Sequence, residues 1–228
     1  MQTEYINKLL AIIKMKFYLT IYLIIFGACS FGQANDSVYK DLNEALKNPL
    51  LVKELIINSQ KVDDFEVIGQ FKNLEILEIS ECSILGFPNS ISELVNLKVL
   101  RFNWNGFRGK NDNVSWKYEI KKICNLNKLE VLDLSYYNTI IKVPSNISCL
   151  KNLKELNLST SIVFKLPNNI YKLKNLEILN IGQTGISILP ERIIKLKKLK
   201  KIVLTDFKIE QNFVDKLKEQ MPECEIYY

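Results

Sequence analysis

The sequence contains no histidine among its 228 residues. A Ser-His or Cys-His nucleophile pair, a histidine general base and a zinc site with histidine ligands are therefore excluded. Glycine is scarce too, because 8 in 228 is about half of the usual share of roughly 7%. The nearest approach to a phosphate-binding loop, at 106–110, has two residues between its glycines where a P-loop has four. We expect a protein that is not an enzyme and has no cofactor.

Hydrophobic residues, in contrast, make up 47% of the chain, which is far more than disordered proteins contain. The net charge of +6 is small and scattered, so we expect no nucleic-acid partner. Lysines gather toward the C-terminus, for example at Lys195, Lys197 and Lys198. A solvated face explains them, and a weak attraction to anionic surfaces is the alternative.

Residues 1–34 have the three parts of a signal peptide. Lys14 and Lys16 precede an apolar run at 17–26, which is followed by small or polar residues through Ala34. The run is shorter than the roughly 20 residues that span a bilayer, so we expect export from a bacterium rather than a retained helix. Met15 stands directly before Lys16, which leaves open whether the chain starts at Met1 or at Met15.

Two cleavage sites compete in this segment. Residues 32–34 resemble an ordinary signal peptidase site and predict secretion. Residues 26–29 resemble a bacterial lipobox, which would make Cys29 a lipidated first residue and tether the protein in the envelope, as in an outer-membrane lipoprotein. Phe26 departs from the Leu, Val or Ile usual at its position, so we favour simple secretion.

A repeated pattern, Leu-x-x-Leu-x-Leu/Ile, dominates the rest of the chain. Six copies start 23, 32, 24, 23 and 23 residues apart. A degenerate copy stands beyond each end of this set. Downstream of four copies a second motif, apolar-Pro-x-x-Ile, returns with Pro88, Pro144, Pro167 and Pro190.

These units resemble the leucine-rich repeat family, in its variant with units of about 23 residues and a Leu-Pro-x-x-Ile segment. The resemblance covers residues 52–228. It implies an α/β solenoid with a curved parallel sheet on the concave side and an irregular or helical convex side. One unit cannot bury its apolar face alone, but stacked units bury it continuously.

The resemblance also divides the chain. We expect an N-terminal helical cap at 35–50, with Asp36 or Ser37 as N-cap, before the repeat domain at 51–228. The unit of 32 residues predicts an insertion near 106–118, and 210–228 a helical C-terminal cap. The family places a polar ladder residue five positions after the second Leu of each unit. That ladder is predicted here at Gln60, Cys82, Asn105, Asn138, Ser161, Thr184 and Phe207.

The cysteines suggest one disulfide. Cys124 and Cys149 lie 25 residues apart in adjacent units, so their Cα atoms could come within disulfide range, and export would permit the bond. The offset of one residue from the 24-residue repeat could instead point their Cβ atoms apart. Cys82 and Cys224 fall on core positions, and no Cys-x-x-Cys exists, so we expect no metal site.

Exposed strand positions on the concave face are the expected ligand-binding surface. Glu78, Arg101 and Asp133 follow one another in its central row. The two acids would lie about 9.6 Å apart, close to the carboxylate separation of inverting glycosidases. Arg101 between them should lower both pKa values, the reverse of what a general acid needs, so we interpret the row as an ion-pair ladder.

Trp104 and Tyr136 are neighbours in the flanking row, beside Arg101, Val99 and Val131. Trp, Tyr and Arg dominate binding hot spots, and packing beneath the 106–116 loop is the alternative role. We therefore expect a non-catalytic recognition module that binds a protein, or a polysaccharide, through its concave face. The alternative is a structural or adhesive lipoprotein tethered in the envelope. Membrane contact is expected only through the signal peptide or the lipid anchor.

Overall fold

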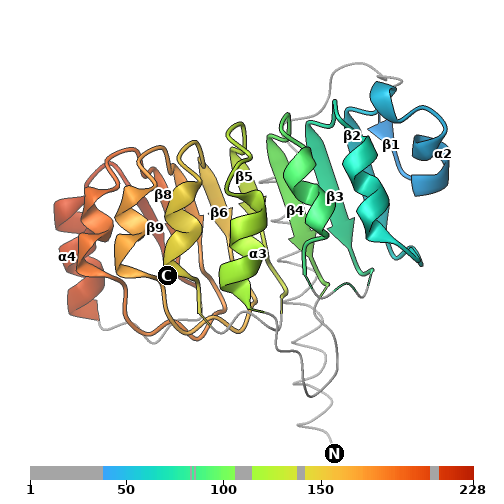
Figure 1. Cartoon of the computed structure of the whole chain (residues 1–228). Helices are drawn as coiled ribbons and strands as arrows, with labels where there is room; N and C mark the ends of the chain where they lie inside the picture. Colours follow the sequence, from blue (N-terminus) through green and yellow to red (C-terminus); the bar gives the residue numbers. More distant parts are fainter. Residues whose placement is uncertain (1–37, 83, 85, 106–114, 138–141, 206–210) are drawn as a thin grey trace, which may run out of the picture. The chain divides into compact units, whose positions relative to one another are not determined.

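The described strands of the chain pair in sequence order, each parallel to the next, in one nine-stranded sheet (Figure 1). The computed structural model describes residues 38–82, 84, 86–105, 115–137, 142–205 and 211–228. The strands are β1 (Val38–Tyr39), β2 (Glu54–Asn58), β3 (Ile76–Ser80), β4 (Val99–Asn103), β5 (Val131–Asp133), β6 (Glu155–Asn157), β7 (Ile178–Asn180), β8 (Lys201–Val203) and β9 (Glu225–Tyr227). This architecture confirms the predicted solenoid.

Alternation within each repeat explains which side of the sheet is buried. Leu77 of β3 pairs in register with Leu100 of β4, and Leu100 with Leu132 of β5. The row continues through Leu156 and Leu179, and none of these leucines has exposed surface. Because side chains alternate across a strand, the residues between them face the opposite, concave side.

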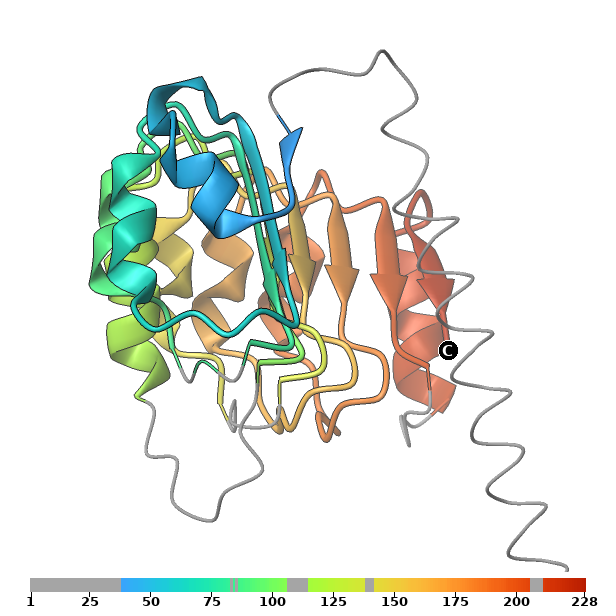
Figure 2. The same ribbon diagram turned by 90° about the vertical axis from the view of Figure 1, so that its right-hand side faces the viewer.

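Short helices cover the other side of the sheet (Figure 2). The 3-10 helices are η2 (Pro49–Leu51), η3 (Phe65–Gln70), η4 (Asn89–Glu93), η5 (Ser145–Cys149), η6 (Asn168–Lys172) and η7 (Glu191–Lys195). The prolines of the second motif stand directly before η4, η5, η6 and η7 as their N-caps. Proline suits this place because its fixed φ leads into the turn. The isoleucine three positions later is buried in each of these helices.

Buried polar side chains join neighbouring units, as the ladder predicts. Asn105 Nδ2 donates to Ile79 O at 2.5 Å, and Cys82 N donates to Asn105 Oδ1 at 3.0 Å. Ser161 Oγ donates to Leu134 O and accepts from Tyr137 N.

The hydrogen bond from Tyr137 N to Ser161 Oγ corrects one predicted position of the ladder. Tyr137, and not Asn138, occupies the ladder position of its unit, because its N–H bonds to Ser161 as that of Cys82 bonds to Asn105. The extra residue of the longer unit therefore follows the ladder position instead of preceding it. Asn138 and Phe207 lie outside the described residues.

A second, exposed ladder runs along the edge at which the strands begin. Asn73, Asn96, Asn152 and Asn175 each donate from Nδ2 to a carbonyl of the preceding unit, at 2.6–2.9 Å. The Asn-Leu dipeptide that recurs at these positions is the sequence signal for this second ladder.

The N-terminal cap differs from the prediction. Val38 and Tyr39 form strand β1, which pairs with β2, and the helix α2 (Leu42–Leu46) starts later than expected. Its N-cap is Asp41, whose carboxylate accepts from Glu44 N at 2.9 Å. Asp36 and Ser37 lie outside the described residues. The helix is short because an edge strand covers the end of the sheet first.

Helix α4 (Gln211–Gln220) lies within the predicted C-terminal cap, where Val214 and Leu217 are buried. The expected signal peptide at 1–34, including Cys29, lies outside the described residues. Across the described part of the chain, no helix combines the length and the apolar character needed to cross a bilayer.

Candidate functional site

The central row of the concave face has the predicted order but not the predicted exposure. Glu78, Arg101 and Asp133 pair in register, and Arg101 Nη1 lies 3.9 Å from Glu78 Oε2. Asp133, however, has no exposed surface, so the expectation that it contacts a ligand is wrong. Val99 and Val131 pair across β4 and β5 and are half-buried.

Asp133 instead ends its strand. Its carboxylate accepts from Ser135 N at 2.9 Å, and Asn157 and Asn180 accept in the same way from Ser159 N and Gly182 N, both at 3.1 Å. Each of these side chains accepts a hydrogen bond from a backbone N–H that would otherwise extend the hydrogen bonding between strands. Accordingly, β5 and the two following strands have three residues where β3 and β4 have five.

The acidic groups of this face also titrate differently from the prediction. Burial raises the pKa of Glu78 and of Asp133, and it outweighs the opposing attraction of Arg101. Burial and the nearby Asp133 raise the pKa of Glu155 from 4.5 to about 7. Arg101 does act to lower the pKa of Glu78 and Asp133 as expected, but the net shift is upward, so the expectation that both pKa values lie below their ordinary range is wrong. In the described part of the chain, no three His, Cys, Asp or Glu side chains are placed to hold a metal ion.

The rings of Trp104 and Tyr136 stack on one another at the end of β4 and β5. Their centroids lie 4.1 Å apart, and their planes differ by 13°. Trp104 keeps 45% of its surface exposed. A tryptophan this exposed in a protein with a large apolar core is a candidate anchor for a partner.

The backbone at this position makes these two residues unusual. Trp104 and Tyr136 have φ values of +55° and +56°, in the left-handed region. The equivalent residue of four other units also has a positive φ: Ser59, Glu81, Thr160 and Gln183. The left-handed turn lets the N–H of Tyr136, for example, donate to Ser159 O at 2.9 Å in the next unit. The repeat thus imposes a conformation that favours glycine or asparagine, yet a tryptophan and a tyrosine stand at these two positions.

The insertion after Trp104 ends in a helix rather than in a polar loop. Residues 106–114 lie outside the described residues, and α3 (Trp116–Ile123) begins immediately after Ser115. Trp116 is buried and packs edge-on against Phe87 and Tyr137, with centroids 5.8 and 5.0 Å away. The end of the predicted insertion near 106–118 therefore includes the buried first residue of α3.

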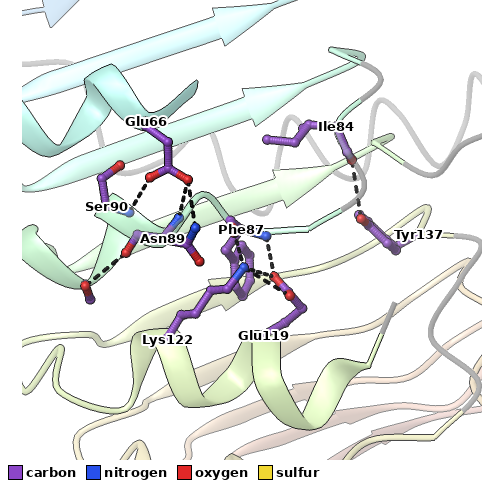
Figure 3. A network of polar contacts seen from close by, with 9 residues as sticks. Glu66, Ile84, Phe87, Asn89, Ser90, Glu119, Lys122 and Tyr137 are labelled. Carbon is purple, nitrogen blue, oxygen red and sulfur yellow. Dashed lines mark hydrogen bonds and ion pairs between the residues drawn. The ribbon is translucent and has the colours of Figure 1, made fainter. Parts of the chain in front are cut away.

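Polar contacts fix this helix against the preceding unit (Figure 3). The carboxylate of Glu119 accepts from Phe87 N, and Lys122 donates to Phe87 O and lies 3.1 Å from Glu119. One unit earlier, Glu66 accepts from Asn89 N and Ser90 N at 2.8 and 2.7 Å, across the start of η4. These contacts hold the helices on the convex side and do not face the concave surface.

Cys124 and Cys149 form a disulfide in the structure, with Cα atoms 5.4 Å apart. Cys124 is the C-cap of α3, and Cys149 is the last residue of η5. In this unit α3 replaces a 3-10 helix and places Cys124 beside the end of η5. The one-residue offset between the two cysteines had left open whether their side chains could meet.

The chain resembles known proteins mainly in its repeats. A family profile described as leucine-rich repeat region matches residues 109–221. TMV resistance protein N of Nicotiana glutinosa is 38% identical over 96 residues, which are 41% of this chain and 8% of that protein. The chain thus spans a small part of this curated relative.

Solved structures share the fold over most of the chain. A leucine-rich repeat protein of Leptospira interrogans is 25% identical with a TM-score of 0.62, over 84% of this chain and 52% of that one. Internalin C2 of Listeria monocytogenes is 18% identical with a TM-score of 0.60, over 86% and 77%. The ectodomain of the plant receptor kinase GASSHO1/SCHENGEN3 from Arabidopsis thaliana is 20% identical with a TM-score of 0.59, over 75% and 20%.

Three observations agree with one another: the matched repeat region, the parallel sheet with one strand for each unit, and the likeness to these solenoids. From this agreement we conclude that the chain contains a leucine-rich repeat solenoid.

Proposed function

We propose that this protein binds a protein partner through its concave face, with the stacked Trp104–Tyr136 pair as the main anchor. The exposure of Trp104 in a row where the backbone favours small residues carries the proposal. A partner that covers the pair buries apolar area that is already held rigid by stacking, so little side-chain entropy is lost.

The surroundings of the pair support a recognition role without catalysis. Arg101 of the central row is half-buried and pairs with Glu78, so it can contribute a charge at the margin of an apolar contact. Leucine-rich repeat domains typically mediate protein interactions, and the plant ectodomain of the same fold was solved in complex with CASPARIAN STRIP INTEGRITY FACTOR 2. A polysaccharide is the less favoured ligand. The Trp104 and Tyr136 rings stack on each other, so each ring has only one face left on which a sugar ring could stack.

The test compares variants that share one backbone conformation. Wild-type protein, Trp104→Asn, Tyr136→Asn and Gln183→Asn are used to recover the partner from cultures of the source organism, and the affinity for the purified partner is then measured by calorimetry. Asn accepts a positive φ, so all three variants keep the local fold. We expect Trp104→Asn and Tyr136→Asn to weaken binding at least about tenfold, or 1.4 kcal/mol, and Gln183→Asn to have little effect. Equal affinities for all four proteins would refute the proposal.

The proposal includes export from a bacterial cell by the signal peptide at 1–34. The Cys124–Cys149 disulfide supports it, because disulfides persist in oxidising compartments. Labelling of cells with a radioactive fatty acid separates secretion from tethering. Label that is lost in Cys29→Ala would support the envelope lipoprotein, and absence of label in the exported wild type supports secretion.

A further inference from the structure

Charges along the edge at which the strands begin are arranged in two different ways. In one row, the sign alternates from unit to unit through Lys53, Glu75, Lys98, Glu130, Lys154, Glu177 and Lys200. Backbone N–H groups bond to the carbonyl of the preceding member along the whole row, at 2.7–2.8 Å. Three ion pairs follow, Lys98–Glu75, Lys154–Glu130 and Lys200–Glu177, at 2.5–2.8 Å. This row neutralises its own charge.

The neighbouring row does the opposite in the C-terminal units. Lys151, Lys174 and Lys197 occupy the same position of three consecutive units and are all exposed. The exposed asparagine ladder keeps them adjacent, since Asn175 Nδ2 donates to Lys151 O at 2.9 Å and Lys198 Nζ to Asn175 Oδ1 at 2.8 Å. Within the described residues none of the three lysines forms an ion pair. Like charges stacked in this way repel one another.

Lys172 and Lys195 lie beside these three lysines. We call the five residues Lys151, Lys172, Lys174, Lys195 and Lys197 the lysine stripe. Lys174 and Lys195 lie over the ring of Tyr171, with Nζ 5.1 and 5.8 Å from its centroid. At the equivalent positions nearer the N-terminus, Lys72 instead pairs with Glu93. The same fold positions thus carry paired charges in one half of the domain and unpaired positive charges in the other.

Apolar side chains are exposed on the same edge. Leu50, Leu51 and Val95 are 60, 65 and 52% exposed. Asn73 Nδ2 donates to Leu50 O at 2.8 Å, and Asn96, the residue after Val95, continues the same ladder. The edge therefore has apolar groups toward β2 and positive charge toward β8.

We infer that this edge docks onto an anionic lipid bilayer, with the lysine stripe over the phosphate headgroups and Leu50 and Leu51 at the interface. Lysines near an anionic membrane surface each contribute to binding, and exposed leucines add apolar area that enters the boundary between headgroups and acyl chains. A soluble polyanion would use the lysines but gain nothing from the leucines, so the lipid surface fits the whole edge better. The lysines near the C-terminus already suggest a weak attraction to anionic surfaces, and this edge would be a membrane contact independent of the predicted signal peptide or lipid anchor.

Sedimentation of the full chain with vesicles tests the inference. The vesicles contain either phosphatidylcholine alone or equal parts of phosphatidylcholine and phosphatidylglycerol, at physiological salt. The test variant is Lys151→Gln/Lys174→Gln/Lys197→Gln. The matched control, Lys61→Gln/Lys142→Gln/Lys165→Gln, removes the same charge from exposed lysines outside the stripe. Residues 1–34 are identical in all proteins, so their contribution cancels, and circular dichroism checks that each variant is folded.

We expect the stripe variant to bind the anionic vesicles at least tenfold more weakly than wild type, and the control to lose less than threefold. Leu50→Ser/Leu51→Ser should weaken binding to the anionic vesicles as well. Equal losses for the stripe and control variants would overturn the inference, because net charge alone would then explain the binding. Binding of polyphosphate without any preference for the anionic vesicles would also overturn it and would identify a soluble polyanion as the ligand.

Discussion

The buried ladder residue Asn105 allows the sharpest test of the fold. Its side chain has no exposed surface, donates to Ile79 O and accepts from Cys82 N. Asn105→Ala leaves the buried carbonyl of Ile79 and the partly buried N–H of Cys82 without these partners, at about 1–3 kcal/mol for each group. The expected loss of unfolding free energy is therefore about 2–6 kcal/mol. For a domain of this size, at about 2–4 °C for each kcal/mol, that loss lowers Tm by roughly 4–24 °C.

Asn96→Ala is the matched control, because Asn96 also joins neighbouring units but belongs to the exposed ladder: its Nδ2 donates to Lys72 O at 2.9 Å, and its Oδ1 accepts from Lys128 Nζ at 2.7 Å. Water replaces its partners in the variant, so we expect a loss of about 1 kcal/mol or less. Thermal unfolding followed by circular dichroism measures both variants. Equal shifts in Tm would show that the buried ladder does not carry the stability assigned to it.

Two further predictions concern the disulfide and the acidic concave face. Cys124→Ser/Cys149→Ser should lower the unfolding free energy by about 3 kcal/mol, as expected for a closed loop of this length, and a reductant should then no longer change Tm as it does in wild type. Glu155 has a pKa of about 7 in the folded state against an ordinary value of 4.5, so its contribution to stability is present below pH 4.5 and is lost as pH rises through 7. Glu155→Gln should consequently be more stable than wild type at pH 8 and differ little from it at pH 4.5 in urea unfolding, and an equal difference at both values would contradict the assigned pKa.

The sequence by itself determined the repeat, its register and therefore the architecture. Leu77, Leu100 and Leu132 recur at the spacing of one unit, and a parallel stack of strands is the arrangement that buries them all. The prolines before the 3-10 helices and the ladder at Asn105 and Ser161 follow from the same period. These features are readable because each depends on residues at a fixed separation along the chain.

Only the tertiary structure decided what happens between units. The burial of Asp133 depends on the side chains of the neighbouring strands, and its pKa rises because burial outweighs the attraction of Arg101. The Cys124–Cys149 bond depends on where α3 ends relative to η5, which a repeat count cannot give when one turn is replaced by a helix. The contrast between the alternating row and the lysine stripe likewise becomes visible only when stacking places equivalent residues side by side. Charge, burial and bond direction are set by neighbours about 23 residues away in the chain, and a local pattern contains no information on how those neighbours are oriented.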